Sequence, residues 1–359
     1  MLMKIVSIQY LRGLAALLVV LAHNSSLLES HWTRHIPGAL GVDVFFIISG
    51  FIMTFITHQF NEAPTSFMVK RFFRIWPVFF VVWLLSFVVV YHDRSLQEMS
   101  CALYFCLQDY SSPGPTFGFS ALGPPWTLSY EILFYAVFTV AMCINYRYRS
   151  FLCALIFLAS SVGFQLYYNG SFTFSSQVSP DMAVTHWWQA WIKLISNTIC
   201  MEFILGMMLA ELIVRQKLPE LNPQMRRILQ VGLVLAFATA LMIGPQPFGL
   251  YGGFWLAAAI MSITVMLGYR KESGHNRTLI FFGDISYSLY LIHYPLMILL
   301  MNSLADKAWT DNLMIFILSI SISVALASMM FFWIEKPAIK AGKRVAHWLS
   351  TPLTLHRRS

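Results

Sequence analysis

Charged residues are scarce in this sequence. Asp, Glu, Lys and Arg make up 11% of its 359 residues, whereas 58% are hydrophobic and the mean hydropathy is +0.65. A soluble domain of this size carries about a quarter charged residues. The composition therefore excludes a soluble globular protein. It predicts an all-α, polytopic membrane protein with almost no room for a separate soluble domain.

The sequence also lacks segments that would divide or redirect the chain. It contains no internal repeat and no Gly/Ser-rich linker. We expect no secretory signal peptide, because the first hydrophobic stretch is long and no small-residue cleavage site follows it. The formal charge is +8. In a membrane protein such an excess mainly reports topology, so we do not expect nucleic-acid binding.

Cysteine is rare as well, and its spacing matches no metal-ligand motif. The five cysteines are Cys101, Cys106, Cys143, Cys153 and Cys200. Most lie in apolar runs, and the simplest interpretation is buried thiols. Cys101 and Cys106 would pair only if they face an oxidising compartment. We expect no metal site and no bound cofactor.

What the sequence does contain is ten hydrophobic segments. Each has roughly the 17–25 apolar residues that a membrane helix needs, the third and seventh being short. They lie at about 5–28, 38–57, 75–91, 126–144, 151–168, 195–214, 228–244, 250–268, 279–301 and 312–334. Alternating the loops between the two sides places 19 of the 24 Lys and Arg residues on the side of the N-terminus and four on the other. By the positive-inside rule, both termini are predicted to be cytoplasmic.

The first hydrophobic segment carries two ionisable residues, Arg12 and His23. They are eleven residues apart, close to three helical turns, so both point from one face roughly 16 Å apart. Ionisable groups inside a membrane helix are costly unless they face a cavity or a partner. The pair therefore predicts a polar path through the bilayer. The alternatives are that Arg12 snorkels to the inner headgroups and that His23 is a neutral core histidine bonded to a carbonyl.

A basic cluster, SFMVKRFFRIWP, precedes the third segment on the inner side. Its cations are Lys70, Arg71 and Arg74, and the two arginines share a face if the stretch is helical. Guanidinium groups match phosphate bidentately, so we expect a cradle for a phosphate-bearing ligand. The alternative is a plain positive-inside cluster.

Lone carboxylates inside apolar segments need partners. Glu131, near the start of the fourth segment, is predicted to pair with His23, because both lie towards the outer side and a carboxylate stabilises an imidazolium. Asp43 is a weaker candidate for the same task. The alternative is that Glu131 braces a helix through an arginine or a backbone group. Glu202 and Glu211 are interpreted as structural.

The ninth segment carries the run GDISYSLYLIHYPL. Tyr287 and His293 from this run, with Ser129 from the fourth segment, are candidates for lining the path. A satisfied packing histidine is the alternative for His293. Glu335 and Lys336, at the inner end of the last segment, are interpreted as a helix-end charge pair.

Six features in order resemble the acyltransferase family 3 membrane enzymes, and the resemblance covers essentially the whole chain. They are Arg12 with His23, GVDVFFIISGF (41–51), KRFFRIWP (70–77), PPWTLSYEILFY (124–135), GDISYSLYLIHYP (283–295) and IEKP (334–337). The resemblance implies that residues 1–334 form a transmembrane acyltransferase domain, followed by a cytoplasmic basic tail, 335–359. We expect no fused SGNH domain, because only about 25 residues follow the last segment.

The resemblance also implies an activity, namely transfer of an acyl group, usually acetyl, from cytoplasmic acyl-CoA to a hydroxyl of a surface polysaccharide such as O-antigen or exopolysaccharide, or of its lipid-linked precursor. The location would be the bacterial inner membrane, with membrane lipid and polysaccharide-assembly proteins as partners. Acyl-CoA would dock on Lys70, Arg71 and Arg74, with Arg12 deeper in the path. His23 would be either a general base or a transient acyl carrier, and the sequence leaves both open.

Two other functions use the same residues without covalent chemistry. In a transporter or flippase, the buried Arg, His and Glu would form a relay, and inverted repeats would favour this reading. In a scaffold of a polysaccharide-assembly complex, they would only hold helices together. Binding and consumption of CoA distinguish the enzyme from both.

Overall fold

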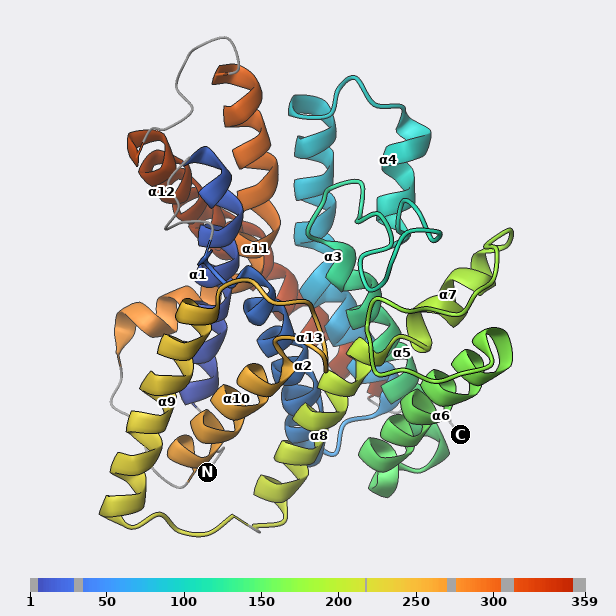
Figure 1. Cartoon of the computed structure of the whole chain (residues 1–359), viewed down its shortest axis with the longest axis vertical. Helices are drawn as coiled ribbons and strands as arrows, with labels where there is room; N and C mark the ends of the chain where they lie inside the picture. The colour runs from blue at the N-terminus through green and yellow to red at the C-terminus, as the bar shows by residue number, and fades with distance from the viewer. Residues whose placement is uncertain (1–5, 29–34, 217, 270–275, 305–312, 351–359) are drawn as a thin grey trace, which may run out of the picture.

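The computed structural model describes residues 6–28, 35–216, 218–269, 276–304 and 313–350, and within these ranges the chain is helical (Figure 1). The described part contains no β-strand, only an isolated bridge between Ser120 and Gly123. The helices are α1 (Val6–Asn24), α2 (Gly38–Phe60), α3 (Pro64–Val89), α4 (Leu96–Leu103), α5 (Trp126–Ile144), α6 (Arg149–Asn169), α7 (Trp187–Ile195), α8 (Met201–Val214), α9 (Pro223–Ile243), α10 (Phe254–Gly268), α11 (Arg277–Leu304), α12 (Leu313–Met330) and α13 (Lys336–Ser350).

The all-α, polytopic architecture is confirmed. In the described ranges, eight helices are long and apolar enough to cross a bilayer, and α7 with α8 makes a ninth if this pair, bent by 56°, is one span. A helix matches each of the ten predicted segments. However, α8 has 14 residues and α10 has 15, fewer than the about 20 that a full crossing needs. Among the residues that the structure describes, the number of full-length spans is therefore eight or nine rather than ten.

Two helix pairs form the centre of the molecule: α1 packs along α11, and α2 packs along α8. Glycines allow both close approaches. A Cβ at Gly13 would lie 2.8 Å from the backbone N of Gly283, and a Cβ at Gly206 would lie 1.9 Å from the carbonyl O of Ile47. Small residues at such contacts let membrane helices pack backbone to backbone.

This packing predicts that Gly206→Val destabilises the protein strongly. The added side chain meets the backbone of α2, which cannot rotate away, so we expect a loss of at least the about 1–3 kcal/mol that overpacking costs. Thermal unfolding in detergent measures the effect. Gly163→Ala is the control, because a Cβ there has no neighbouring atom within 4 Å. Equal melting temperatures for the two variants would contradict the prediction.

Helix α3 begins at Pro64, eleven residues before the predicted span, and proline suits the first helical turn. The basic cluster is therefore helical, and Arg71 and Arg74 share a face. The hydropathy pattern misplaced the start because these cations interrupt an otherwise continuous helix.

The end of α12 runs through a π-helix, Phe331–Glu335, into α13, which packs against α3. The first part of the predicted tail 335–359 is thus a docked helix. Residues 351–359 lie outside the described residues.

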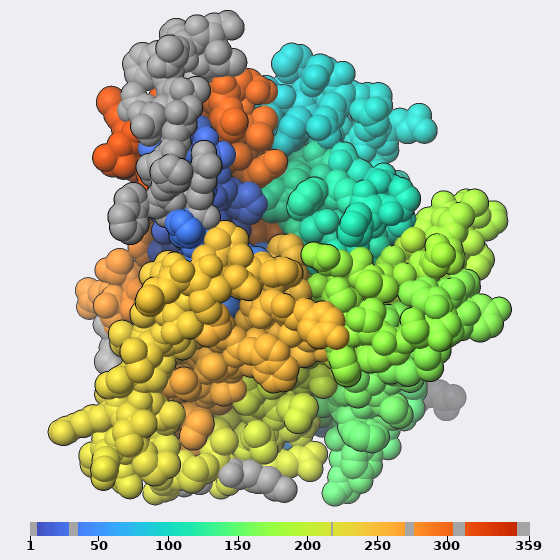
Figure 2. Space-filling view, viewed as in Figure 1, coloured from blue at the N-terminus to red at the C-terminus, as the bar shows by residue number. Residues whose placement is uncertain are grey.

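Residues 90–125 connect α3 to α5 on the predicted outer side. We call them the outer segment. Its one helix of more than a turn, α4, has eight residues, too few to span a bilayer. Ser95 caps α4 by accepting a hydrogen bond from the backbone N–H of Glu98. The outer segment faces the ends of α1 and α11 across a hollow and forms one of its walls (Figure 2).

Candidate active site

Two adjacent cavities lie in the helix bundle and share lining residues. The inner cavity, of about 280 Å³, is lined by residues of α1, α2, α3, α5 and α11. The outer cavity, of about 780 Å³, is lined by the outer ends of α1 and α11, by the outer segment and by the turn before α10. Val42 and Tyr290 line both cavities. These two side chains therefore form the boundary between the inner and the outer space.

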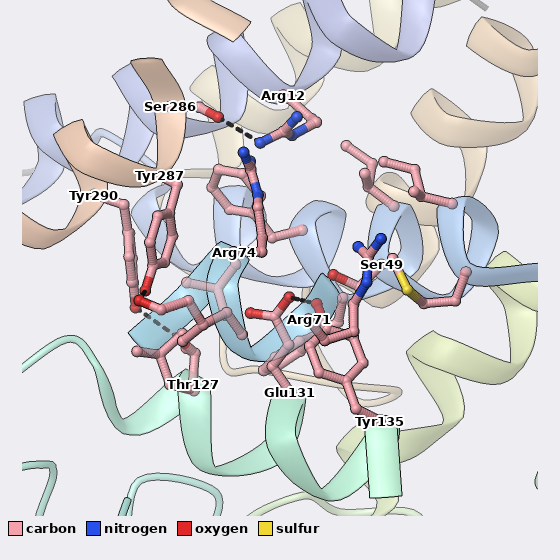
Figure 3. A pocket seen from close by; sticks show the side chains of 18 of the residues that line it. Arg12, Ser49, Arg71, Arg74, Thr127, Glu131, Tyr135, Ser286, Tyr287 and Tyr290 are labelled. Atoms are coloured by element: carbon pink, nitrogen blue, oxygen red, sulfur yellow. Dashed lines mark hydrogen bonds between the residues drawn. The ribbon is translucent and has the colours of Figure 1, made fainter. Parts of the chain in front are cut away.

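The inner cavity gathers positive charge. Arg12 from α1 and Arg71 and Arg74 from α3 all line it, in the common path that the family resemblance implied (Figure 3). Their apolar neighbours include Phe45 and Ile52 of α2. Three guanidinium groups in a mostly apolar cavity are an arrangement suited to an anionic ligand with an apolar arm.

The three arginines differ in the ion pairs and hydrogen bonds that their side chains form. Arg74 forms an ion pair with Glu335, 2.6 Å from Nη1 to Oε1, and Glu335 is fully buried. The other oxygen of Glu335 accepts a hydrogen bond from Ser288. The expected charge pair between Glu335 and Lys336 is therefore wrong. The π-helix that ends at Glu335 changes the turn there, so the carboxylate points into the bundle towards Arg74.

Arg71 is the least satisfied cation of the inner cavity. No carboxylate pairs with it among the residues that the structure describes, and its Nε is buried without a hydrogen-bond partner. Its guanidinium lies over the rings of Phe67 and Tyr135, 5.6 and 6.0 Å from their centroids. A buried donor without an acceptor is costly, so Arg71 is ready to bind an anion.

Arg12 and Lys70 are held by other side chains. Arg12 donates to Ser286, 2.9 Å from Nη2 to Oγ, and to Gln9. Lys70 pairs with Glu62 at 2.5 Å and does not line the inner cavity. Lys70 therefore does not join Arg71 and Arg74, with which the sequence grouped it, in the inner cavity.

Glu131 does not meet His23. It lines the inner cavity beside the arginines and accepts a hydrogen bond from the hydroxyl of Tyr135 (Figure 3). The predicted pair of His23 and Glu131 is wrong, because the second turn of α5 lies deeper in the bundle than its outer end. Asp43 does not reach His23 either. It is fully buried in side-chain contact with Glu202 of α8.

His23 lines the outer cavity and rests on a second histidine. Its Nδ1 lies 2.9 Å from the carbonyl O of Val19 and 3.3 Å from Nε2 of His293. Nδ1 of His293 lies 3.1 Å from the carbonyl O of Leu289. A carbonyl oxygen only accepts, so Nδ1 carries the proton in both neutral rings. This leaves a free lone pair on Nε2 of the partly exposed His23, which can take a proton or attack a carbonyl.

The common face of Arg12 and His23, predicted from their spacing, is observed, because each contacts a residue of α11: Ser286 and His293 respectively. His293 is fully buried behind His23 and lines neither cavity. The sequence made His293 a candidate for lining the path, whereas the structure places it behind His23.

Of the other two path candidates, Tyr287 lines the inner cavity and donates to the carbonyl O of Ile75. Ser129 lines neither cavity, because its hydroxyl donates to the carbonyl O of Phe105 at 2.6 Å. Tyr290 forms a helical stripe with Tyr287 and Tyr294 in the sequence but was not among the predicted lining residues. The structure adds it, with its hydroxyl 2.8 Å from that of Thr127.

Comparisons with known proteins identify the family of this chain. A family model described as an acyltransferase domain matches residues 5–331. The chain is 26% identical to the exopolysaccharide production protein ExoZ of Rhizobium meliloti (strain 1021), covering 85% of this chain and 91% of that protein. It is 24% identical to the peptidoglycan O-acetyltransferase OatA of Listeria monocytogenes, covering 94% of this chain but 56% of that protein. No solved structure matches. Because the family model covers nearly the whole chain, this protein belongs to the acyltransferase family 3.

Proposed function

We propose that this protein transfers an acyl group, usually acetyl, from acyl-CoA to a hydroxyl of a surface polysaccharide or its lipid-linked precursor. The observation that carries the proposal is the pair of cavities that meet at Tyr290, one lined with arginines and the other with His23. Family membership and relatives named for exopolysaccharide production and O-acetyl transfer support it. The protein would reside in the bacterial inner membrane with both termini in the cytoplasm.

The donor would enter the inner cavity from the cytoplasm. Its phosphates bind at the inner ends of α3 and α1, where Arg71 has donors to spare and Arg74 and Arg12 add charge. The pantetheine arm lies along the apolar wall and brings the thioester to Tyr290.

The acceptor would enter the outer cavity, whose volume of about 780 Å³ falls within the range of about 300–1,000 Å³ that is usual for ligand sites. Aromatic side chains on its walls offer flat faces to sugar rings, and polar groups beside them offer hydrogen bonds. The aromatic residues include Tyr91, Trp126 and Tyr294, and the polar ones include Asp93 and Asn302.

The transfer then needs one base. Nε2 of His23 takes the proton of the sugar hydroxyl, and the oxygen attacks the thioester carbonyl. The C–S bond breaks as the ester forms, and the departing CoA sulfur takes the proton from His23. The carbonyl O of Val19 accepts from Nδ1 throughout and so holds the ring in the required tautomer. If the same lone pair attacks the thioester instead, label from the donor would stay on the protein when acceptor is withheld.

The test supplies purified protein with labelled acetyl-CoA and a crude fraction of lipid-linked polysaccharide. We expect labelled glycan and free CoA. If well-folded protein neither bound nor consumed CoA, this result would overturn the proposal and favour a transporter. CoA release without labelled glycan would support acyl-CoA as the donor. It would also exclude the supplied lipid-linked polysaccharide as the acceptor.

Arg71→Ala is predicted to raise the KM for acetyl-CoA about 10- to 100-fold with a smaller effect on kcat. This is the fold-change expected for a lost charge-assisted hydrogen bond of about 1.5–3 kcal/mol. Steady-state kinetics with varied donor measure it. Arg147→Ala is the matched control, because Arg147 is an exposed arginine of the inner side outside the cavity. An unchanged KM in Arg71→Ala would argue against phosphate binding at this position.

A further inference from the structure

Two cysteines lie outside the helix bundle. Cys101 is in the last turn of α4, and Cys106 follows the helix in the outer segment. Both are partly exposed, whereas Cys153 and Cys200 are buried in the core. Neither Cys101 nor Cys106 lines the inner or the outer cavity, and the proposed transfer does not use them.

The turn that ends α4 brings these two residues together. The N–H of Cys106 donates to the carbonyl O of Cys101 at 3.2 Å, and the N–H of Phe105 donates to that of Ala102 at 3.0 Å. Phe105 has a left-handed backbone, with φ of 56°. These are the two hydrogen bonds and the left-handed residue of a Schellman motif, in which the side chains of the first and last residues commonly touch. Here both of those residues are cysteine, and their thiols are in contact.

The contact also favours the reactive thiolate form of Cys106. A side-chain hydrogen bond with Cys101 lowers the pKa of Cys106 to about 7. At neutral pH a substantial fraction of Cys106 is therefore thiolate, which is the nucleophile of thiol–disulfide exchange.

We propose that Cys101 and Cys106 form a disulfide on the outer face of the membrane. The oxidant is an external disulfide, either of a small molecule or of a thiol oxidoreductase. The Cys106 thiolate attacks one of its sulfurs and releases a first thiol. Cys101 then loses its proton, attacks the sulfur of Cys106 and releases a second thiol, so that the external disulfide is reduced as the internal one forms. The inference rests on the proposed orientation, because only the outer compartment is oxidising.

The disulfide would fasten a wall of the outer cavity. Between the two cysteines, the ring of Phe105 stacks on Phe79 of α3 at 5.1 Å, and its carbonyl O accepts from Ser129 of α5. A non-glycine residue pays a cost for a left-handed backbone, and a cross-link over the turn holds it there. The chain that follows, including Gln108 and residues 118–121, lines the outer cavity. Oxidation therefore fixes the position of residues that would contact the acceptor.

The first experiment uses purified protein in detergent, incubated with oxidised glutathione, denatured and digested. Peptide mass spectrometry should find Cys101 and Cys106 joined in one peptide, lighter by two hydrogen atoms, and the mass should return with a reductant. Cys101→Ser is the control, in which Cys106 should carry a glutathione adduct instead. Free thiols, or a stable glutathione adduct on Cys106 of the wild type, would overturn the proposal.

The second experiment asks whether the bond exists in cells. Intact cells are treated with a membrane-permeant maleimide, and the protein is then reduced and labelled with a second maleimide. We expect the second label on Cys101 and Cys106, and the first on Cys143, which lies near the inner end of α5. The first label on both members of the pair would overturn the proposal in cells. Acetyl transfer is measured separately, so this failure would leave the proposed function standing.

Discussion

His23→Ala is expected to lower kcat for acetyl transfer by about 10²–10⁴-fold, the usual contribution of a general base. The expectation follows from the ring itself, because Val19 fixes the proton on Nδ1 and leaves Nε2 open to the outer cavity. The KM for acetyl-CoA should change little, since the donor phosphates would bind at the other end of the path. Kinetics at saturating donor, on protein of matched folded yield, measure the effect.

Two other histidines serve as controls for this result. His58→Ala removes an exposed ring at the inner end of α2 and should leave kcat unchanged. His293→Ala removes the ring behind His23, and we expect a smaller loss, because His293 positions His23 and lines neither cavity. His293→Gln should restore part of that loss by offering a polar atom near Nδ1 of His23. A His23→Ala variant with the activity of His58→Ala would exclude His23 from the chemistry.

The parts of this site that the sequence predicted are those fixed by one helix at a time. The common face of Arg12 and His23 follows from a spacing of eleven residues, since each residue turns an α-helix by about 100°. The common face of Arg71 and Arg74 follows in the same way from a spacing of three residues. The helical segments follow from runs of apolar residues that a bilayer requires. Such periodic features depend on local backbone geometry, which is the same in any fold that contains the helix.

The partners of these residues depend on how far each helix extends along its neighbour, and periodicity carries no such information. Glu131 and His23 are both near the outer ends of their segments in the sequence, yet α5 places Glu131 a turn deeper, beside the arginines. Asp43 meets Glu202 because glycines bring α2 and α8 close together. The ion pair of Glu335 with Arg74 depends on a π-helix, for which the hydropathy pattern holds no signal.

Glu335→Ala is expected to be the most damaging change outside the chemistry itself. Breaking a buried ion pair costs about 3–5 kcal/mol, since one charge is left without its partner. We expect the lower end of this range, because Arg74 keeps 24% of its side chain exposed whereas Glu335 has none. Ser288 also loses its acceptor. Thermal or denaturant unfolding in detergent measures the loss. Glu211→Ala is the control, because its pair with the largely exposed Arg215 is worth about 0–1 kcal/mol.

A second variant separates the lost pair from the lost packing. If the stranded charge of Arg74 causes the damage, then Arg74→Met in the Glu335→Ala background should recover part of the stability, because an apolar side chain leaves no unpaired cation. The double variant should still bind acetyl-CoA less tightly than wild type, since one of the three arginines is gone. If stability did not recover, Glu335 would stabilise the fold through its hydrogen bond with Ser288 and its packing against α11. The ion pair with Arg74 would then contribute little to stability, and Arg74 could contact the donor without destabilising the fold.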